Sequence, residues 1–179
     1  KDHHSLTDCV GTAKSPLIHR YVRDASGPPV DFSVTTLQID GHSCKLQIWD
    51  TVAEALHRTI TLSYFRGAAA VFLVYSVTDE QSFHHIREWA VQVEQHCSSS
   101  VVKVLIANNC EVAEEERQVA IERGEQLAQE LGMAGFFETC PLSFPKVEQP
   151  FLFAVRAILE NMFPLGSKSA AKVSSPAAI

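Results

Sequence analysis

Long apolar segments and an excess of positive charge are both missing from this sequence of 179 residues. The longest apolar run, Ala68–Tyr75, is far shorter than the roughly 20 residues that a helix needs to cross a bilayer. The formal net charge of −6 argues against non-specific binding to nucleic acid, which needs a basic surface. The polar first residues also lack the pattern of a signal peptide. We therefore expect a cytoplasmic protein with no transmembrane segment and no nucleic-acid partner.

Cysteine pairs with the spacing of a metal site are also missing. The five cysteines are scattered, and no Cys-x-x-Cys pair occurs among them. This pattern favours reduced thiols over a zinc site or a disulfide framework. The adjacent His3 and His4 do not predict a metal site either, because neighbouring side chains on a strand point to opposite faces.

Apolar patterns predict strands that alternate with helices. Ser33–Asp40 and Lys45–Asp50 alternate between apolar and polar residues and meet near Asp40-Gly41, which predicts an antiparallel hairpin. Continuous apolar runs at Ala69–Val77 and Val101–Ala107 predict strands that are buried on both faces of a parallel sheet. A short strand is expected at Phe136–Cys140.

Helical spacing predicts three further segments. These are Ser82–Cys97, Glu115–Leu131 ended by Gly132, and Val147–Met162 with Pro150 in its first turn. The alternation of strands and helices predicts an α/β fold with a mostly parallel sheet and helices on both faces. We expect one domain over residues 1–162 and a disordered, polar C-terminal tail over residues 163–179.

The segment Gly11-Thr12-Ala13-Lys14-Ser15 resembles part of a phosphate-binding loop, G-x-x-x-x-G-K-S/T. In such a loop the backbone N–H groups surround the phosphates, the lysine reaches the outer phosphates and the hydroxyl holds Mg²⁺. Lys14 and Ser15 fit this pattern. Asp8 and Ala13, however, stand where the pattern has glycine, and Asp8 brings negative charge toward a phosphate.

Five segments in order resemble the Rab branch of Ras-like GTPases. They are LQIWDT at 46–51, HRTITLSYFRGAAAVFLVYSVTDEQSF at 57–83, VKVLIANNCEV at 102–112, FFETC at 136–140 and VEQPFLFAVRAIL at 147–159. The resemblance implies a P-loop NTPase fold with a six-stranded sheet and one antiparallel strand. It also implies GTP/GDP and Mg²⁺ as ligands, protein effectors or regulators of Rab type as partners, and a role in vesicle trafficking.

The resemblance assigns roles around the phosphates. Ser15 and Asp50 match the residues that hold or assist Mg²⁺. Ala53 replaces the glycine whose N–H meets the γ-phosphate, and Glu54 replaces the glutamine that orients the attacking water. A carboxylate there would repel the phosphate, so we expect impaired hydrolysis. Glu54 could equally be an ordinary exposed loop acid.

The base-recognition motifs also depart from the family. Asn108-Asn109-Cys110-Glu111 stands in place of Asn-Lys-x-Asp, so that the long lysine stem is lost and the acid is one methylene longer. Cys140-Pro141-Leu142 replaces Ser-Ala-Lys. The backbone N–H of the middle residue meets the guanine oxygen in the family, and Pro141 has none.

Two further departures concern the switch and the membrane anchor. The loop after the first helix, Ala25–Pro29, is short and lacks the threonine that closes on Mg²⁺ and the γ-phosphate. No cysteine follows Cys140, so membrane association through a C-terminal prenylated cysteine is not expected. Three interpretations stay open: a weakly nucleotide-binding trafficking regulator, a nucleotide-independent interaction module (a pseudo-GTPase), or a decaying copy of the family.

Overall fold

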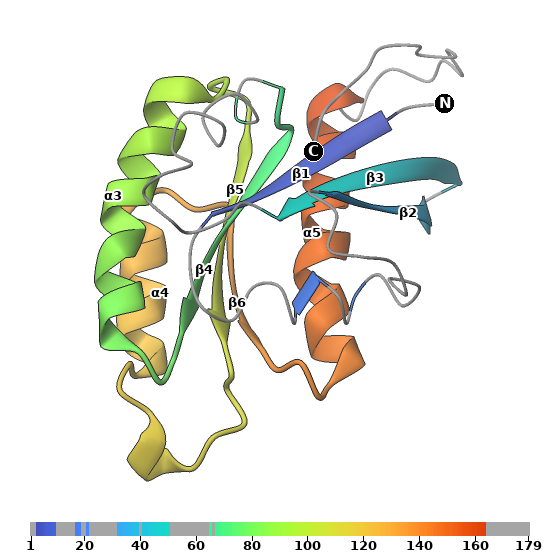
Figure 1. The fold of residues 1–179 in the computed structure, drawn as a ribbon. Helices are drawn as coiled ribbons and strands as arrows, with labels where there is room; N and C mark the ends of the chain where they lie inside the picture. The colour runs from blue at the N-terminus through green and yellow to red at the C-terminus, as the bar shows by residue number, and fades with distance from the viewer. Residues whose placement is uncertain are drawn as a thin grey trace.

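The strands form one sheet with helices on both faces (Figure 1). A computed structural model of the chain describes residues 3–9, 17–18, 21, 32–39, 41–50, 65 and 67–163. Its strands are β1 His3–Cys9, β2 Phe32–Ile39, β3 His42–Asp50, β4 Ala70–Ser76, β5 Val102–Asn108 and β6 Gly135–Thr139. Its helices are α3 Glu80–His96, α4 Ile121–Glu130 and α5 Phe144–Met162, with a short 3₁₀ helix, η2, at Glu114–Glu116.

The strand order in the sheet is β2-β3-β1-β4-β5-β6. Only β2 and β3 pair in antiparallel fashion, and the other neighbours are parallel. Helices α3 and α4 cover one face of the sheet and α5 covers the other (Figure 1). The predicted α/β fold with a mostly parallel sheet is therefore confirmed.

The hairpin of β2 and β3 is confirmed and turns at Gly41, whose φ is +82°. A positive φ is readily adopted by glycine, which has no Cβ to clash. In the edge strand β2 the predicted alternation is confirmed only in part: Leu37 and Ile39 lie on the more buried side, whereas the apolar Val34 is exposed. Strand β1 also forms, in spite of its two histidines, and pairs with β3 on one side and β4 on the other.

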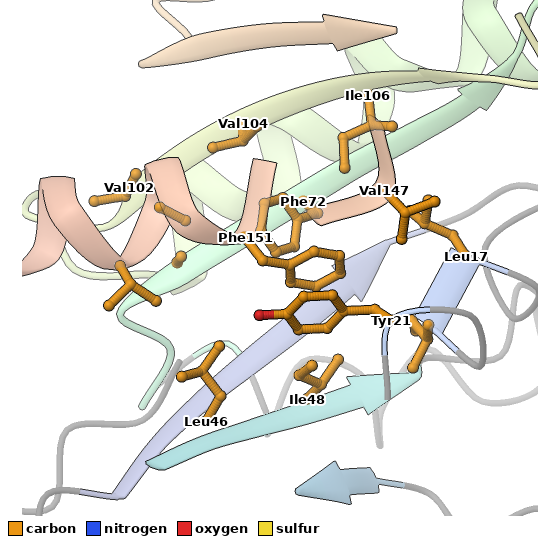
Figure 2. Packing of buried hydrophobic residues seen from close by; sticks show 14 of the residues in the cluster. Leu17, Tyr21, Leu46, Ile48, Phe72, Val102, Val104, Ile106, Val147 and Phe151 are labelled. Carbon is orange, nitrogen blue, oxygen red and sulfur yellow. The ribbon is translucent and has the colours of Figure 1, made fainter. Parts of the chain in front are cut away.

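Strand β4 separates two apolar cores. Successive side chains of a strand point to opposite faces, so that Phe72 lies in one core and Leu73 in the other. On the α5 side, the ring of Phe151 stacks on Tyr21 with centroids 3.9 Å apart and meets Phe72 edge-on at 5.0 Å (Figure 2). On the other side, Phe83 and further residues of α3 and α4 pack against the sheet. Both faces of β4 are therefore buried against apolar side chains.

The predicted helix at Glu115–Leu131 was wrong at its start. The chain makes only the short η2 turn there, and α4 begins at Ile121. Val119 is fully buried, but it lies outside the helix because the N–H groups of Gln118 and Val119 both donate to the carbonyl of Val77, at 2.8 and 3.1 Å. These tertiary bonds hold the segment extended. The predicted stop at Gly132 is confirmed, since its φ is +59°.

Helix α5 begins at Phe144, earlier than the predicted Val147. Pro145 therefore occupies the first turn, and the placement of Pro150 in that turn was wrong. Pro150 lies inside the helix and is buried. Proline cannot donate a helical hydrogen bond, so the helix lacks one such bond at this position. The predicted disordered tail lies outside the described residues from residue 164 onward.

Candidate functional site

The structure describes only part of the predicted site. Asp50 ends β3, and its backbone lies in register with that of Asp8 on the neighbouring strand β1. The other predicted phosphate, magnesium and catalytic residues lie outside the described residues, namely Gly11, Thr12, Ala13, Lys14, Ser15, Ala53 and Glu54. Their roles stay predictions.

The predicted base-recognition residues come together where β5 and β6 end. Asn108 and Thr139 are partners in the parallel pairing of these strands. Beyond them, the Cys110 N–H donates to the Thr139 carbonyl at 3.1 Å. Because parallel strands end at the same edge of a sheet, the loops that follow carry the predicted residues to one place. These residues are Asn108, Asn109, Glu111, Cys140 and Pro141.

Asn108 anchors the base of these two loops. It is fully buried, and its side-chain oxygen accepts a hydrogen bond of 2.9 Å from the Thr139 hydroxyl. Its carbonyl accepts from the Val77 N–H at 3.0 Å. Sequence reasoning did not select Thr139 as a site residue, although it lies in the recognised segment FFETC. The pairing of β5 with β6 is what reveals its role.

Asn109 has a left-handed backbone, with φ of +66°, a conformation that asparagine adopts more easily than most residues. Its side-chain Nδ2 donates to the Ser76 hydroxyl at 3.0 Å. Ser76 in turn shares a hydrogen bond of 2.8 Å with the Thr78 hydroxyl. Asn109 thus joins the end of β4 to the end of β5, a contact that the sequence did not reveal.

A pocket of about 360 Å³ opens between these loops. That volume lies within the range of roughly 300–1,000 Å³ that is usual for small-molecule sites. Val112 and the side chain of Leu142, which is 82% exposed, supply apolar surface at its edge. The complete lining consists of Thr78, Asn109, Glu111, Val112, Cys140, Pro141 and Leu142.

In the loop after β6, two backbone N–H groups donate to atoms of the same loop. The Leu142 N–H donates to the Cys140 Sγ at 3.3 Å, and the Ser143 N–H donates to the Cys140 carbonyl at 3.0 Å. Burial raises the pKa of the Cys140 thiol, and a hydrogen bond with Glu111 raises it further. The thiol is therefore neutral near pH 7. Pro141, between them, has no N–H to offer to a ligand.

An ion pair joins β6 to the segment before α4, next to these loops. Arg117 Nη1 lies 2.8 Å from Glu138 Oε1 and also donates to the Val119 carbonyl at 3.1 Å. Both side chains are mostly buried, at 15% and 22% exposed. The hydrogen bond to Glu138 raises the pKa of Arg117, so the guanidinium stays charged. The pair joins β6 to the extended segment before α4.

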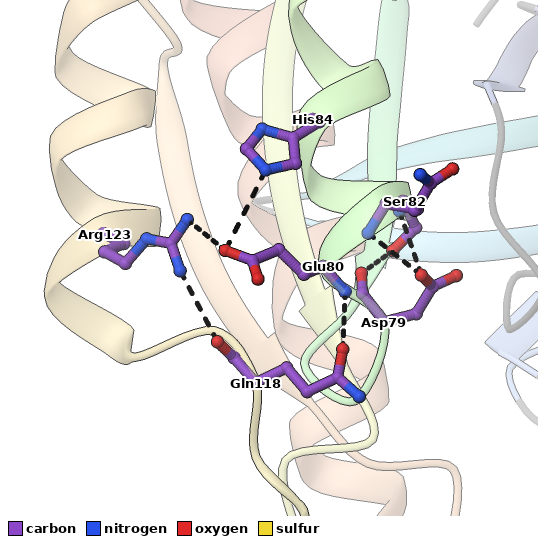
Figure 3. A network of polar contacts seen from close by, with 7 residues as sticks. Asp79, Glu80, Ser82, His84, Gln118 and Arg123 are labelled. Carbon is purple, nitrogen blue, oxygen red and sulfur yellow. Dashed lines mark hydrogen bonds and ion pairs between the residues drawn. The ribbon is translucent and has the colours of Figure 1, made fainter.

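A second polar network fixes the loop that carries Thr78 (Figure 3). Asp79 caps α3 by accepting from the N–H groups of Gln81 and Ser82, at 3.0 and 3.3 Å. The Glu80 N–H donates to the Gln118 side chain at 3.1 Å, and the Glu80 carboxylate lies 2.8 Å from Arg123. These contacts tie the start of α3 to the segment before α4. The loop that carries Thr78, a residue of the pocket lining, is therefore held by polar contacts.

Membrane crossing has no candidate among the described helices, since none combines the required length with the required apolar character.

Comparison with known proteins agrees with this arrangement. The pattern of the Ras family matches residues 8–160. The chain is 42% identical over 154 residues to the GTP-binding protein ypt2 of Schizosaccharomyces pombe, covering 83% of this chain and 76% of the relative. It is 40% identical over 165 residues to the Ras-related protein RABE1e of Arabidopsis thaliana (89% and 75%), and 38% identical over 177 residues to the Ras-related protein Rab-8A of Bos taurus (92% and 84%).

The fold and these matches show that the chain belongs to the Ras family of small GTPases. Within that family it is of the Rab type, as the segments LQIWDT, VKVLIANNCEV and FFETC predicted.

The described base end of the site fits a guanine nucleotide only in part. Asn108 is in place and held by Thr139. Pro141 cannot supply the N–H that the family uses for the guanine oxygen, and Asn109 has no stem with which to cover the ring.

Proposed function

We propose that this Rab-type protein is a cytoplasmic regulator of vesicle trafficking that acts through protein effectors, and that it binds guanine nucleotides weakly and hydrolyses GTP poorly. Family membership supports the trafficking role, because its relatives are Rab proteins and one is named as GTP-binding. The departures within the site support the weak binding and the slow hydrolysis.

One observation carries the proposal of weak binding. At the loop that should meet the guanine oxygen, Pro141 has no N–H, and the next N–H, that of Leu142, is already engaged by the Cys140 Sγ. Neither position offers a donor to a base. On the opposite loop, the Asn109 amide donates to Ser76. Asn108 is present, but Asn109 and Pro141 do not supply the base contacts that the family resemblance implies at their positions.

The sequence adds changes at the phosphate end. Asp8 and Ala13 replace glycines of the phosphate loop, and Ala53 and Glu54 replace the glycine and glutamine of the hydrolysis loop. The threonine that would close on Mg²⁺ has no counterpart. A switch needs a segment that orders on the γ-phosphate and relaxes after hydrolysis, so we expect little nucleotide-dependent change in shape.

The losses add up to a large change in affinity. A missing hydrogen bond to a charged or buried group costs roughly 1–3 kcal/mol. Several such losses in one site reduce a tight affinity to roughly micromolar or weaker, because every 1.4 kcal/mol is a factor of about ten.

A direct titration tests the proposal. The purified chain is titrated with a fluorescent GTP analogue in the presence of Mg²⁺, and the GTP-binding relative ypt2 is measured in parallel as a positive control. We expect a Kd in the micromolar range or weaker for this chain, and GTP turnover well below that of the control. Nanomolar binding would contradict the proposal.

A second candidate function is a nucleotide-independent interaction module. The observation that favours it is that Asn108, the best-preserved base-recognition residue, is already satisfied by Thr139 within the protein. The Asn108 side-chain oxygen therefore has a partner without any nucleotide. Capture of the same effector by nucleotide-free and GTP-loaded protein with equal affinity would favour this candidate.

A further inference from the structure

Leu142 has the most exposed large apolar side chain of the residues that the structure describes, at 82%. A single exposed leucine is common on protein surfaces. Leu142, however, lies at the edge of the pocket of about 360 Å³, together with Val112, Pro141 and the buried Cys140. A pocket of this size has room for one aliphatic side chain. A ligand that covers the pocket edge would therefore remove apolar surface from water.

The loop that follows β5 is strongly acidic. We refer to Glu111–Glu116 as the acidic loop, because four of its six residues are glutamates and all four are exposed. Its first two residues, Glu111 and Val112, line the pocket. Residues 111–130 together contain seven acidic and two basic residues, and both basic residues already form ion pairs. This segment therefore carries most of the chain's net charge of −6.

Backbone hydrogen bonds hold both ends of the acidic loop. Before it, the Asn108 carbonyl accepts from the Val77 N–H at 3.0 Å. After it, the N–H groups of Gln118 and Val119 donate to the Val77 carbonyl at 2.8 and 3.1 Å. A segment whose ends are already fixed loses little conformational freedom when a partner binds. The acidic loop is therefore presented to a partner in a preformed position.

The acidic loop and the loop that carries Leu142 lie at the same end of the sheet, where β5 and β6 end (Figure 1). One positive charge also lies here, since Lys146 at the start of α5 donates to the Cys110 Sγ at 3.6 Å. One lysine does not balance four glutamates, so the potential beside the pocket is negative. Such a surface repels nucleic acids and anionic bilayers and attracts a basic protein segment.

We infer that this end of the molecule docks a basic segment of a partner protein. The segment places one leucine-sized apolar side chain in the pocket beside Leu142 and its lysine or arginine side chains along the acidic loop. The apolar pocket supplies the anchor, and the charge of the acidic loop selects a basic occupant. The inference rests on the proposed function, since it gives the chemistry and the location of a protein partner.

The pocket and the acidic loop contribute to binding in different ways. Burial of a leucine side chain corresponds to an affinity gain of about 10–100-fold. The glutamates mainly speed association, and salt screens them, because the Debye length falls from about 10 Å at 0.1 M to about 3 Å at 1 M ionic strength. We therefore expect binding that requires the apolar anchor and that weakens as salt is added.

The test uses fluorescence anisotropy on the full chain without added nucleotide. The probe is a labelled peptide with one central leucine and three lysines on each side. We expect a Kd of roughly 10–100 µM at 0.1 M salt. Serine in place of the leucine should weaken binding by about tenfold or more. Raising the salt to 1 M should weaken it by about fivefold or more, and glutamates in place of the lysines should abolish it.

Two variants of the chain locate the site. Leu142→Ser should weaken binding of the leucine peptide by about 3–10-fold and leave binding of the serine peptide unchanged. Glu114→Gln with Glu115→Gln should weaken the leucine peptide by about 3–10-fold at 0.1 M salt and reduce its salt dependence. The matched control, Glu88→Gln with Glu160→Gln, removes the same charge from exposed positions of α3 and α5 and should change the Kd by less than about twofold. Circular dichroism checks that the variants fold.

The outcomes separate this inference from the proposal of weak nucleotide binding. Equal affinity for the leucine and serine peptides, equal losses in the two double variants, or no saturable binding of the leucine peptide would overturn the inference. The peptide comparison on the unaltered chain decides the matter even if a variant does not fold. Nanomolar GTP binding together with selective peptide binding would overturn only the proposal of weak nucleotide binding. Micromolar GTP binding without peptide selectivity would overturn only this inference.

Discussion

The strand ends beneath the pocket and the loop tips above them differ in how their polar groups are matched. Below, Asn108 accepts from Thr139 at 2.9 Å, and Arg117 pairs with Glu138 at 2.8 Å. Above, Pro141 offers no donor and Leu142 directs its N–H to a thiol of its own loop. The strand ends are joined by these polar contacts, whereas at the loop tips Pro141 has no N–H and the Leu142 N–H is engaged within its own loop.

Under the proposed function, this difference means that the fold is kept while its ligand site changes. Scaffold contacts such as that of Phe151 with Tyr21 are part of the buried core, so their loss would lower the stability of the fold. Groups at the loop tips that contact only a ligand add little to the stability of the free chain. Substitutions such as Pro141 can therefore accumulate there with little cost to stability. The predictions below, ordered from the largest effect to the smallest, test this separation.

The first prediction removes a core ring. Phe151→Ala deletes a fully buried side chain that stacks on Tyr21 and meets Phe72. The variant should lower the free energy of unfolding by about 3–5 kcal/mol, measured by urea denaturation. Leu142→Ala is the matched control at the loop tip, and its effect should stay within about 0.5 kcal/mol because the side chain is 82% exposed. Similar losses in the free energy of unfolding for the two variants would contradict the difference between the core and the loop tips.

The second prediction removes the polar anchor. Asn108→Ala leaves the buried Thr139 hydroxyl without its acceptor, and should cost about 1–3 kcal/mol of stability in the same assay. Asn109→Gly is the control, since glycine tolerates the φ of +66° and the lost side-chain bond to Ser76 lies at a half-buried position. A loss of stability in Asn108→Ala no larger than in the control would show that the bond between Asn108 and Thr139 does not support the loops.

The outcome of sequence reasoning follows the same division. The strands β4 and β5 could be predicted because burial on both faces requires continuous apolar runs such as Ala70–Ser76 and Val102–Asn108. The start of α4 could not, because Val119 fits a helical pattern and only its bond to the distant Val77 carbonyl excludes it from the helix. Pro150 likewise looks like a first-turn residue until the position of Phe144 is known.

The candidate site was predictable where residue identity alone decides the chemistry. Pro141 lacks an N–H in any fold, so its effect was visible in the sequence. The bond from Asn109 to Ser76 joins residues 33 positions apart and needs the adjacency of β4 and β5. The same holds for Thr139 and Asn108, which only the parallel pairing of β5 with β6 brings together.

The third prediction concerns the network of Figure 3. Arg123 lies 2.8 Å from Glu80 and 5.0 Å over the Phe83 ring, but both charged side chains are nearly half exposed. Solvent screens such contacts, so Arg123→Gln should cost about 1 kcal/mol or less. Thermal unfolding in low and high salt measures it. A loss above 2 kcal/mol would show that this surface network supports the pocket far more than its exposure implies.

The fourth prediction uses a thiol of the scaffold. Burial raises the pKa of Cys97, at the end of α3, to about 11. Only the thiolate reacts with iodoacetamide, so alkylation of Cys97 should be slow at pH 8 and should rise up to about pH 11. The folded state holds the proton more tightly than the unfolded chain, so this group lowers stability as the pH rises from about 9 to 11. Mass spectrometry of the alkylated protein checks the rate, and a plateau already near pH 9 would contradict it.

The melting temperature with and without GTP tests the central claim most directly, namely that the scaffold stands while the nucleotide site is weak. At 10 µM GTP with excess Mg²⁺, a Kd of about 10 µM or weaker adds at most about 0.4 kcal/mol, which raises the melting temperature by about 2 °C or less. We expect a cooperative transition that moves by no more than this. A Kd of about 10 nM would add about 4 kcal/mol and raise the melting temperature by about 8 °C or more, and that result would contradict the account.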